Sequence, residues 1–134
     1  MFKGFANVVL PTHDLGASVS DWTRVLGQEP VFVGDDFAVF AGNGVHIGLS
    51  SRPWVDFPLV FWRVDDIEQA HQTLLERGAR ALGEVADGSL TELGTAEITN
   101  GDPSTGIVDL PGGRLAVLRV PDGNLIALEQ EGAT

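Results

Sequence analysis

The sequence predicts an α+β fold of two tandem βαβββ modules, whose curved mixed sheets enclose a concave cavity. The order of strand and helix patterns repeats once along the chain, and each copy is too short to bury its own sheet face. Residues 7–14 align with residues 59–66 at an offset of 52, and both stretches end in aspartate before a helical pattern. We expect one domain, with modules at about residues 2–54 and 58–131.

The first module begins with a short apolar strand at residues 5–11. Asp14 can cap the helix that follows, and Gly27 can end it. Three short strands separated by glycine-containing turns come next, at residues 30–33, 37–41 and 45–50.

The second module repeats this order. A strand is expected at residues 59–64, then a helix that begins after Asp66 and ends at Gly78. Its last three strands are expected at residues 81–85, 115–120 and 125–129. Pro121, Asp122 and Gly123 predict the tight turn of a hairpin before the last strand.

The second module carries an insertion. From the helix-ending glycine to the next matched strand the first module takes about 10 residues and the second about 37, most of the excess lying in residues 87–113. Long connections are either functional or loose. The insertion is therefore expected to be a flap over the cavity, an arm that reaches a second subunit, or a mobile surface loop.

Composition excludes several classes. The 8 Lys and Arg against 19 Asp and Glu give a formal net charge of −11, which repels nucleic-acid phosphates and anionic lipid and favours cationic partners. The lack of cysteine excludes disulfides and a thiolate nucleophile. No run approaches the roughly 18 apolar residues of a membrane helix. We expect a cytoplasmic protein that binds neither nucleic acid nor membrane.

These features together resemble the vicinal-oxygen-chelate superfamily, which includes glyoxalase I, bleomycin-resistance proteins, ring-cleaving dioxygenases and fosfomycin-resistance enzymes. The resemblance rests on the paired modules, Asp14 and Asp66 before the two helices, Trp22 ahead of the first helix end, and the turn from Pro121 to Asn124. It covers the chain apart from the insertion.

The resemblance implies four metal-ligand positions, on the first and last strands of each module. Here they hold Asn7, Gly48, Leu59 and Ala127. Only the asparagine amide could bind a divalent ion, which needs several hard or borderline ligands together. We therefore expect no metal and no cofactor.

Strand alternation places a set of side chains on the cavity side. This side is expected to be apolar in the middle, with room at the glycine and alanine for an organic guest. Arg63 and Glu129 are expected to pair with each other, with ligand, or with water. His46 is the candidate acid or base, whereas His13 and His71 are expected on the surface. The predicted ligand-binding residues are Asn7, His46, Gly48, Trp54, Leu59, Phe61, Arg63, Ala127 and Glu129.

Three functions follow from this interpretation. The first is a metal-free binding protein of the bleomycin-resistance type, which sequesters an aromatic or cationic ligand such as an antibiotic. The second is a glyoxalase- or dioxygenase-like lyase or isomerase that uses His46 or Glu129, either without metal or with an unconventional site of Asn7, His46 and Glu129. The third is an accessory domain with a vestigial cavity. A homodimer is expected, since family members often complete their cavities across a two-fold axis.

Overall fold

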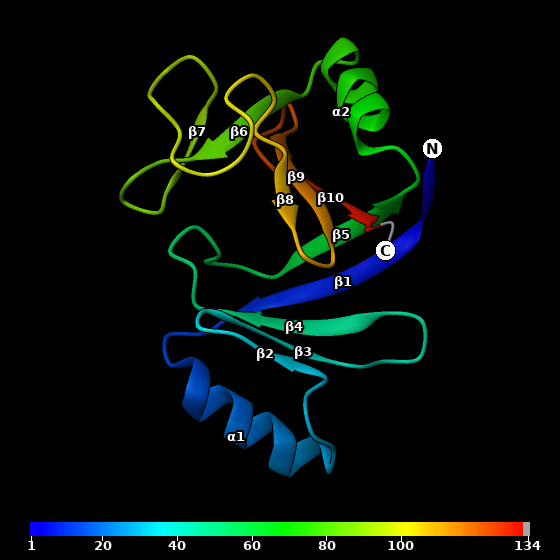
Figure 1. Cartoon of the computed structure of the whole chain (residues 1–134), viewed down its shortest axis with the longest axis vertical. Coiled ribbons are helices and arrows are strands. Elements are labelled where there is room, and N and C mark those ends of the chain that lie inside the picture. Colours follow the sequence, from blue (N-terminus) through cyan, green and yellow to red (C-terminus); the bar gives the residue numbers. More distant parts are fainter. Residues whose placement is uncertain (133–134) are drawn as a thin grey trace. The chain divides into compact units, whose positions relative to one another are not determined.

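The structure is a computed structural model that describes residues 1–132 of the chain. Its strands and helices form two compact units (Figure 1): residues 5–60, and residues from 61 onward together with 1–4. The α+β class and the order of helices and strands in both predicted modules are confirmed. No helix within residues 1–132 combines the length and the apolar character that a membrane crossing requires.

The first unit has one helix and a four-stranded sheet in the order β2-β3-β4-β1. The last strand runs parallel to the first, and the other neighbours are antiparallel, so the sheet is mixed as predicted. Its elements are β1 (Phe2–Pro11), α1 (Leu15–Leu26), β2 (Phe32–Val33), β3 (Phe37–Phe40) and β4 (His46–Ser50).

The second unit repeats this topology, with strand order β5-β10-β9-β6-β7 and β8 beside β9. Here too the last strand, β10, runs parallel to the first, β5. Most strand ends lie within a few residues of the prediction. The elements are β5 (Leu59–Val64), α2 (Ile67–Glu76), β6 (Arg80–Glu84), β7 (Leu90–Glu92), β8 (Val108–Leu110), β9 (Gly113–Arg119) and β10 (Leu125–Glu131).

The two helices begin in the same way. The Asp14 carboxylate accepts a hydrogen bond from the Ala17 backbone N–H at 3.0 Å, and that of Asp66 accepts one from the Gln69 backbone N–H at 3.1 Å. Each bond satisfies a donor that the first helical turn leaves unpaired. The two cap backbones are almost identical, with φ and ψ of −136° and 97° at Asp14 and of −134° and 98° at Asp66.

The strand registers confirm the internal repeat. In the first unit Val9 and Val39 both lie opposite Gly48, and in the second unit Phe61 and Val117 both lie opposite Ala127. These pairs are equivalent under the alignment that the sequence predicts. Gly48 and Ala127 therefore occupy equivalent positions in the last strands of their respective units.

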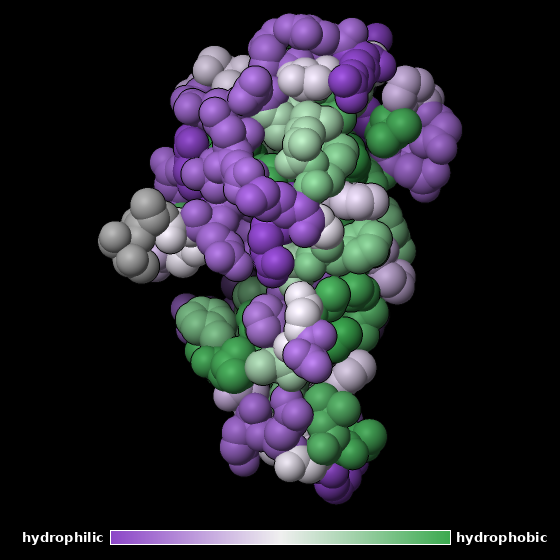
Figure 2. Space-filling view, turned by 90° about the vertical axis from the view of Figure 1, so that its right-hand side faces the viewer, coloured by the Kyte–Doolittle hydropathy of each residue, from purple (hydrophilic) through white to green (hydrophobic). Residues whose placement is uncertain are grey.

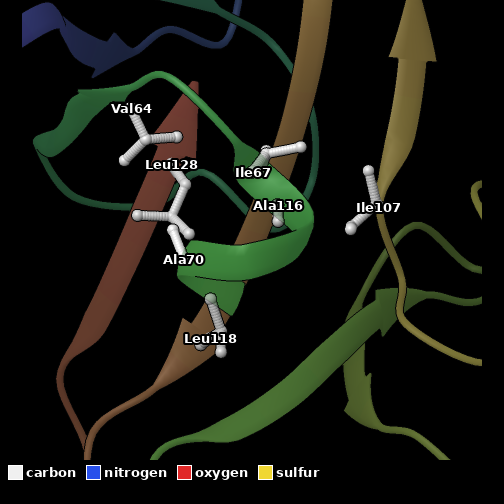
Figure 3. Close-up of a cluster of buried hydrophobic side chains, with 7 residues drawn as sticks. All are labelled: Val64, Ile67, Ala70, Ile107, Ala116, Leu118 and Leu128. Carbon is white, nitrogen blue, oxygen red and sulfur yellow. The ribbon is translucent and has the colours of Figure 1, made fainter. Parts of the chain in front are cut away.

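Each helix covers one face of its own sheet. In the first unit Leu15, Ala38, Phe40 and Leu49 form the buried core, with Trp22 packed against it. In the second unit Ile67 and Ala70 of α2 meet Ala116, Leu118 and Leu128 of the sheet (Figure 3), with Trp62 alongside. Both tryptophans are partly buried against the core of their own unit.

The insertion is part of the second unit's architecture. Residues 90–92 pair with β6 and residues 108–110 pair with β9, so both are strands that the sequence interpretation missed. Ile107 is 3% exposed and joins the core between α2 and β9 (Figure 3). The alternative of a loose surface loop is wrong, because an apolar anchor and two strand pairings fix the segment. Its roles as flap or arm stay predictions.

One glycine sets how closely the insertion approaches β6. Gly106 has φ of +79°, and a Cβ placed on it would lie 2.2 Å from the Leu82 carbonyl oxygen. Only glycine adopts this conformation with so short an approach. The insertion therefore lies directly against the backbone of β6 at this point.

Candidate functional site

In the first unit, the positions that the resemblance implies for metal ligands, Asn7 and Gly48, lie on the sheet face opposite α1. Asn7 lies opposite His46 in the parallel pairing of β1 with β4, and Gly48 follows two residues later. Side chains two residues apart on a strand share a face, so His46 and Gly48 lie on the same face of β4. Asn7 is 9% exposed and therefore buried.

The space at Gly48 is occupied. A Cβ added there would lie 3.0 Å from two ring carbons of Phe37 and 3.2 Å from a methyl group of Val9. The ring of a neighbouring strand thus packs over the glycine. The expectation that Gly48 leaves room for a guest is wrong, because side chains of its own unit already fill the position.

In the second module, which begins with β5, the equivalent positions are buried and apolar. Leu59 is 4% exposed and Ala127 is fully buried. Phe61 lies opposite Ala127 in the pairing of β5 with β10, on the face turned away from α2. Within residues 1–132, no three His, Cys, Asp or Glu side chains gather closely enough to hold a metal ion.

His46 has one ring nitrogen engaged. Its Nδ1 accepts a hydrogen bond from the Gly42 backbone N–H at 3.2 Å, which assigns the proton of the neutral ring to Nε2. The side chain is half-buried at the start of β4. This arrangement leaves only Nε2 for a further hydrogen bond, and in the neutral ring that nitrogen is a donor.

The charged residues of this face lie at the end of β10. Arg63 lies opposite Glu129 in register, and its Nε is 3.4 Å from a carboxylate oxygen of Glu131. The two side chains therefore form an ion pair. They form no hydrogen bond through Nε, which is buried and has no hydrogen-bond partner. The predicted pairing of Arg63 with Glu129 stays a prediction. Trp54, in the connector before β5, is half-buried.

His71 is not on the surface, contrary to the prediction. It lies on α2, is 2% exposed, and its Nε2 has no hydrogen-bond partner among the described residues. Burial lowers the pKa of His71, and a hydrogen bond to the Thr105 backbone opposes that effect in part. The prediction failed because Thr105 belongs to the insertion, whose packing beside α2 the sequence pattern did not show. His13 is exposed, as expected.

A hollow of about 430 Å³ that the sequence interpretation missed lies wholly within the second unit. It contains Arg80, Glu92 and Arg119, and the turn of residues 120–123 forms one wall. Arg80 and Arg119 lie directly opposite each other in the antiparallel pairing of β6 with β9. The sequence did hold one signal for this hollow, because two predicted strands of an acidic chain each carry an arginine. Which residues of β6 and β9 lie opposite each other could not be predicted, because the insertion separates these strands.

No protein-family model and no curated protein matches the sequence. Among solved structures, the chain is similar to a variant of Streptomyces coelicolor methylmalonyl-CoA epimerase in complex with 2-nitronate-propionyl-CoA, with a TM-score of 0.68 and 16% identity over 100% of this chain and 98% of that one.

It is also similar to methylmalonyl-CoA epimerase from Mycobacterium tuberculosis, with a TM-score of 0.63 and 18% identity over 98% and 90% of the two chains. A third is a glyoxalase/bleomycin resistance protein/dioxygenase superfamily member from Vibrio splendidus 12B01, with a TM-score of 0.55 and 21% identity over 93% and 96%. The chain therefore has the vicinal-oxygen-chelate fold of the glyoxalase, bleomycin-resistance and dioxygenase proteins.

Proposed function

We propose that this protein binds a small organic molecule without a metal ion, as a bleomycin-resistance protein does, and sequesters an aromatic or cationic guest such as an antibiotic. The observation that carries the proposal is the identity of the residues at the equivalent positions of the two last strands. Gly48 and Ala127 are buried, lie in matching registers and have no donor atom for a metal. Leu59 has none either, so the amide of Asn7 is the single side-chain donor at these positions.

The guest would be held by shape, stacking and charge. Phe61, which is buried at 7% exposure, lies opposite Ala127 on the helix-free face of the second unit, and Trp54 is a half-buried indole. Aromatic rings stack on flat guests and attract cations over their faces. The net charge of −11 favours a cationic guest over an anionic one.

A ligand screen with two variants tests the proposal. Thermal-shift assays against cationic drugs and aromatic metabolites identify a guest, and titration calorimetry then measures its affinity. Phe61→Leu is expected to weaken binding about tenfold, because an aliphatic side chain cannot stack. Phe57→Leu is the matched control, since Phe57 is an exposed phenylalanine of the connector and should leave the affinity unchanged. No stabilisation by any compound contradicts the proposal.

Metal content is the complementary test. Elemental analysis is made on protein purified without chelator or affinity tag. A stoichiometric Zn, Ni, Mn or Fe signal would replace the proposal with a metal-dependent one.

An enzyme is the alternative, and the fold neighbours that are epimerases favour it. His46 or Glu129 would then act as the acid or base of a lyase or isomerase. Because His46 Nδ1 accepts the Gly42 hydrogen bond, Nε2 is the ring atom that would exchange a proton. Turnover that is lost in His46→Gln, while guest affinity is retained, would establish this alternative.

We further propose a homodimer, which sedimentation equilibrium would test. The large exposed hydrophobic residues of the first unit supply apolar surface for a partner: Val25, Leu26, Val31, Phe32 and Val33 are among them. Figure 2 shows that hydrophobic residues reach the surface on one face of the molecule.

A further inference from the structure

We propose that Arg80 and Arg119 form a binding site for a phosphate group, free or carried by a small molecule. This inference goes beyond the proposed function, because it concerns a separate hollow whose walls all come from residues 78–123. It does not depend on the metal-ligand seats or on the identity of an aromatic guest.

The first argument is the opposition of like charges. Arg80 and Arg119 are cross-strand partners, so their side chains lie opposite each other on one face of the sheet. Like charges directly opposite each other destabilise a sheet. A bound anion between the two guanidinium groups would remove that repulsion.

The second argument is that carboxylates of the chain neutralise the charges of Arg80 and Arg119 only in part. Arg80 Nε lies 3.8 Å from a carboxylate oxygen of Glu92, and the side chains are 71% and 45% exposed, so this long ion pair is weak. Arg119 donates from Nη1 to the Gly123 carbonyl oxygen at 3.3 Å and has no carboxylate partner among residues 1–132. The hollow thus contains two guanidinium groups and one carboxylate, which pairs with Arg80 only, in a chain whose net charge is −11.

The third argument is that the hollow is built from fixed backbone. Gly123 has φ of +96° in a turn closed by its N–H bond to the Val120 carbonyl oxygen at 2.8 Å. Gly78 has φ of +103°, and a Cβ there would lie 3.7 Å from Pro121, so two loops meet at this wall. The bond to Gly123 directs the Arg119 side chain toward this turn.

The one carboxylate of the turn is engaged in hydrogen bonds within the turn. Asp122 accepts from the Asn124 backbone N–H and from the Asn124 side-chain amide, both at 2.9 Å. These bonds lower the pKa of Asp122, so the group stays ionised without forming an ion pair with Arg119.

Phosphate suits this arrangement better than a carboxylate. Each guanidinium presents a planar fork of donors, and a planar carboxylate is matched by one such fork. A tetrahedral phosphate has three terminal oxygens and can accept from two forks at once. Its charge, about −1.5 to −2 at neutral pH for a monoester, balances both arginines once Glu92 is displaced.

The test is an NMR titration of the whole ¹⁵N-labelled chain with inorganic phosphate, phenyl phosphate and acetate. Phosphate is expected to shift the amide signals of Gly78 and Gly123, and acetate to bind at least about tenfold more weakly. Tighter binding of phenyl phosphate than of inorganic phosphate assigns the site to organic phosphates, and equal binding assigns it to the free ion. Absence of shifts at both glycines, or equal binding of acetate, overturns the proposal.

Three variants separate this site from general charge effects. Arg119→Gln is expected to weaken phosphate binding about tenfold, whereas Arg24→Gln, an exposed arginine paired with Asp21 on α1, should not change it. Glu92→Gln is expected to tighten binding about threefold, because it releases Arg80. That gain also tests the site independently of any folding defect in the arginine variant.

Glu76→Gln is the matched control for Glu92→Gln, since it changes the net charge equally at the exposed end of α2. Equal gains in both glutamate variants, or an unchanged affinity in Arg119→Gln, would overturn the assignment.

Discussion

The two units share a topology but differ in how their helices are covered. In the first unit, Leu15 is the buried residue of α1, and hydrophobic side chains at its end and on β2 are exposed. In the second unit α2 buries Ile67, Ala70 and His71, and the insertion contributes Ile107 to the same core. The difference shows that the extra residues of the second unit complete a core rather than decorate a surface.

The comparison also bears on function. The equivalent seats at 48 and 127 are closed in different ways, by the Phe37 ring over a glycine and by a fully buried alanine. Glycine and alanine have no side-chain donor atom, so neither last strand offers a metal ligand at this position. The hollow that contains Arg80 and Arg119 lies in the second unit. There the insertion supplies β7, which pairs with β6 and contributes Glu92 to the hollow.

The strongest test of the comparison removes the core contact of the insertion. Ile107→Ala is expected to lower the free energy of unfolding by about 2 to 5 kcal/mol, because it leaves a cavity beside α2. Urea unfolding followed by circular dichroism measures this change. The control is Leu110→Ala, since Leu110 is an exposed residue of the same insertion and should cost far less. Equal losses would mean that the insertion is not anchored through the core.

A second test uses the histidine that the insertion buries. Burial holds the pKa of His71 below 6.5, so on acidification the unfolded chain takes up the proton first. The stability that the neutral ring contributes is complete above about pH 6.5 and is lost as the pH falls towards the lower folded pKa. Unfolding titrations at about pH 8 and about pH 5 should show this loss in the wild type and a smaller one in His71→Leu. An unchanged pH dependence in the variant would show that the ring is solvated.

The helix caps provide a test in which the two units should agree. Asp14→Ala and Asp66→Ala each remove one hydrogen bond to the first helical turn, with nearly the same backbone geometry. Each is expected to cost about 1 kcal/mol in denaturant unfolding. A loss confined to one variant would reveal that the helix starts are not equivalent energetically.

The smallest effect is expected at the exposed strand of the first unit. Val33→Lys should change the free energy of unfolding by no more than about 0.5 kcal/mol, because Val33 is 55% exposed. If β2 lies in a dimer contact, the same change should shift the chain to monomer in sedimentation. A large loss of stability in the monomer would show that this edge is packed more tightly than its exposure indicates.

The sequence predicted the parts of the fold that depend on local patterns. Asp14 and Asp66, the hairpin turn before β10, and the offset between repeats were sufficient to place both helices and most strands. The insertion was not predictable in the same way, because its pairing with β6 and β9 depends on contacts distant in the sequence. Because the insertion was not placed, His71 was wrongly expected on the surface and the opposition of Arg80 and Arg119 was missed. The filled space at Gly48 was missed because alternation tells which face a residue occupies, but not that Phe37 leans across it from the neighbouring strand.

The glycine at 106 has a consequence for how this chain can vary. Any larger side chain there would collide with the Leu82 carbonyl oxygen, whereas a Cβ at Gly94 of the same segment would meet nothing within 4 Å. A saturation library of the segment should therefore accept many substitutions at 94, limited mainly by backbone strain, and almost none at 106. A single hydrogen atom in place of a methyl group decides whether the segment can pack against the backbone of β6.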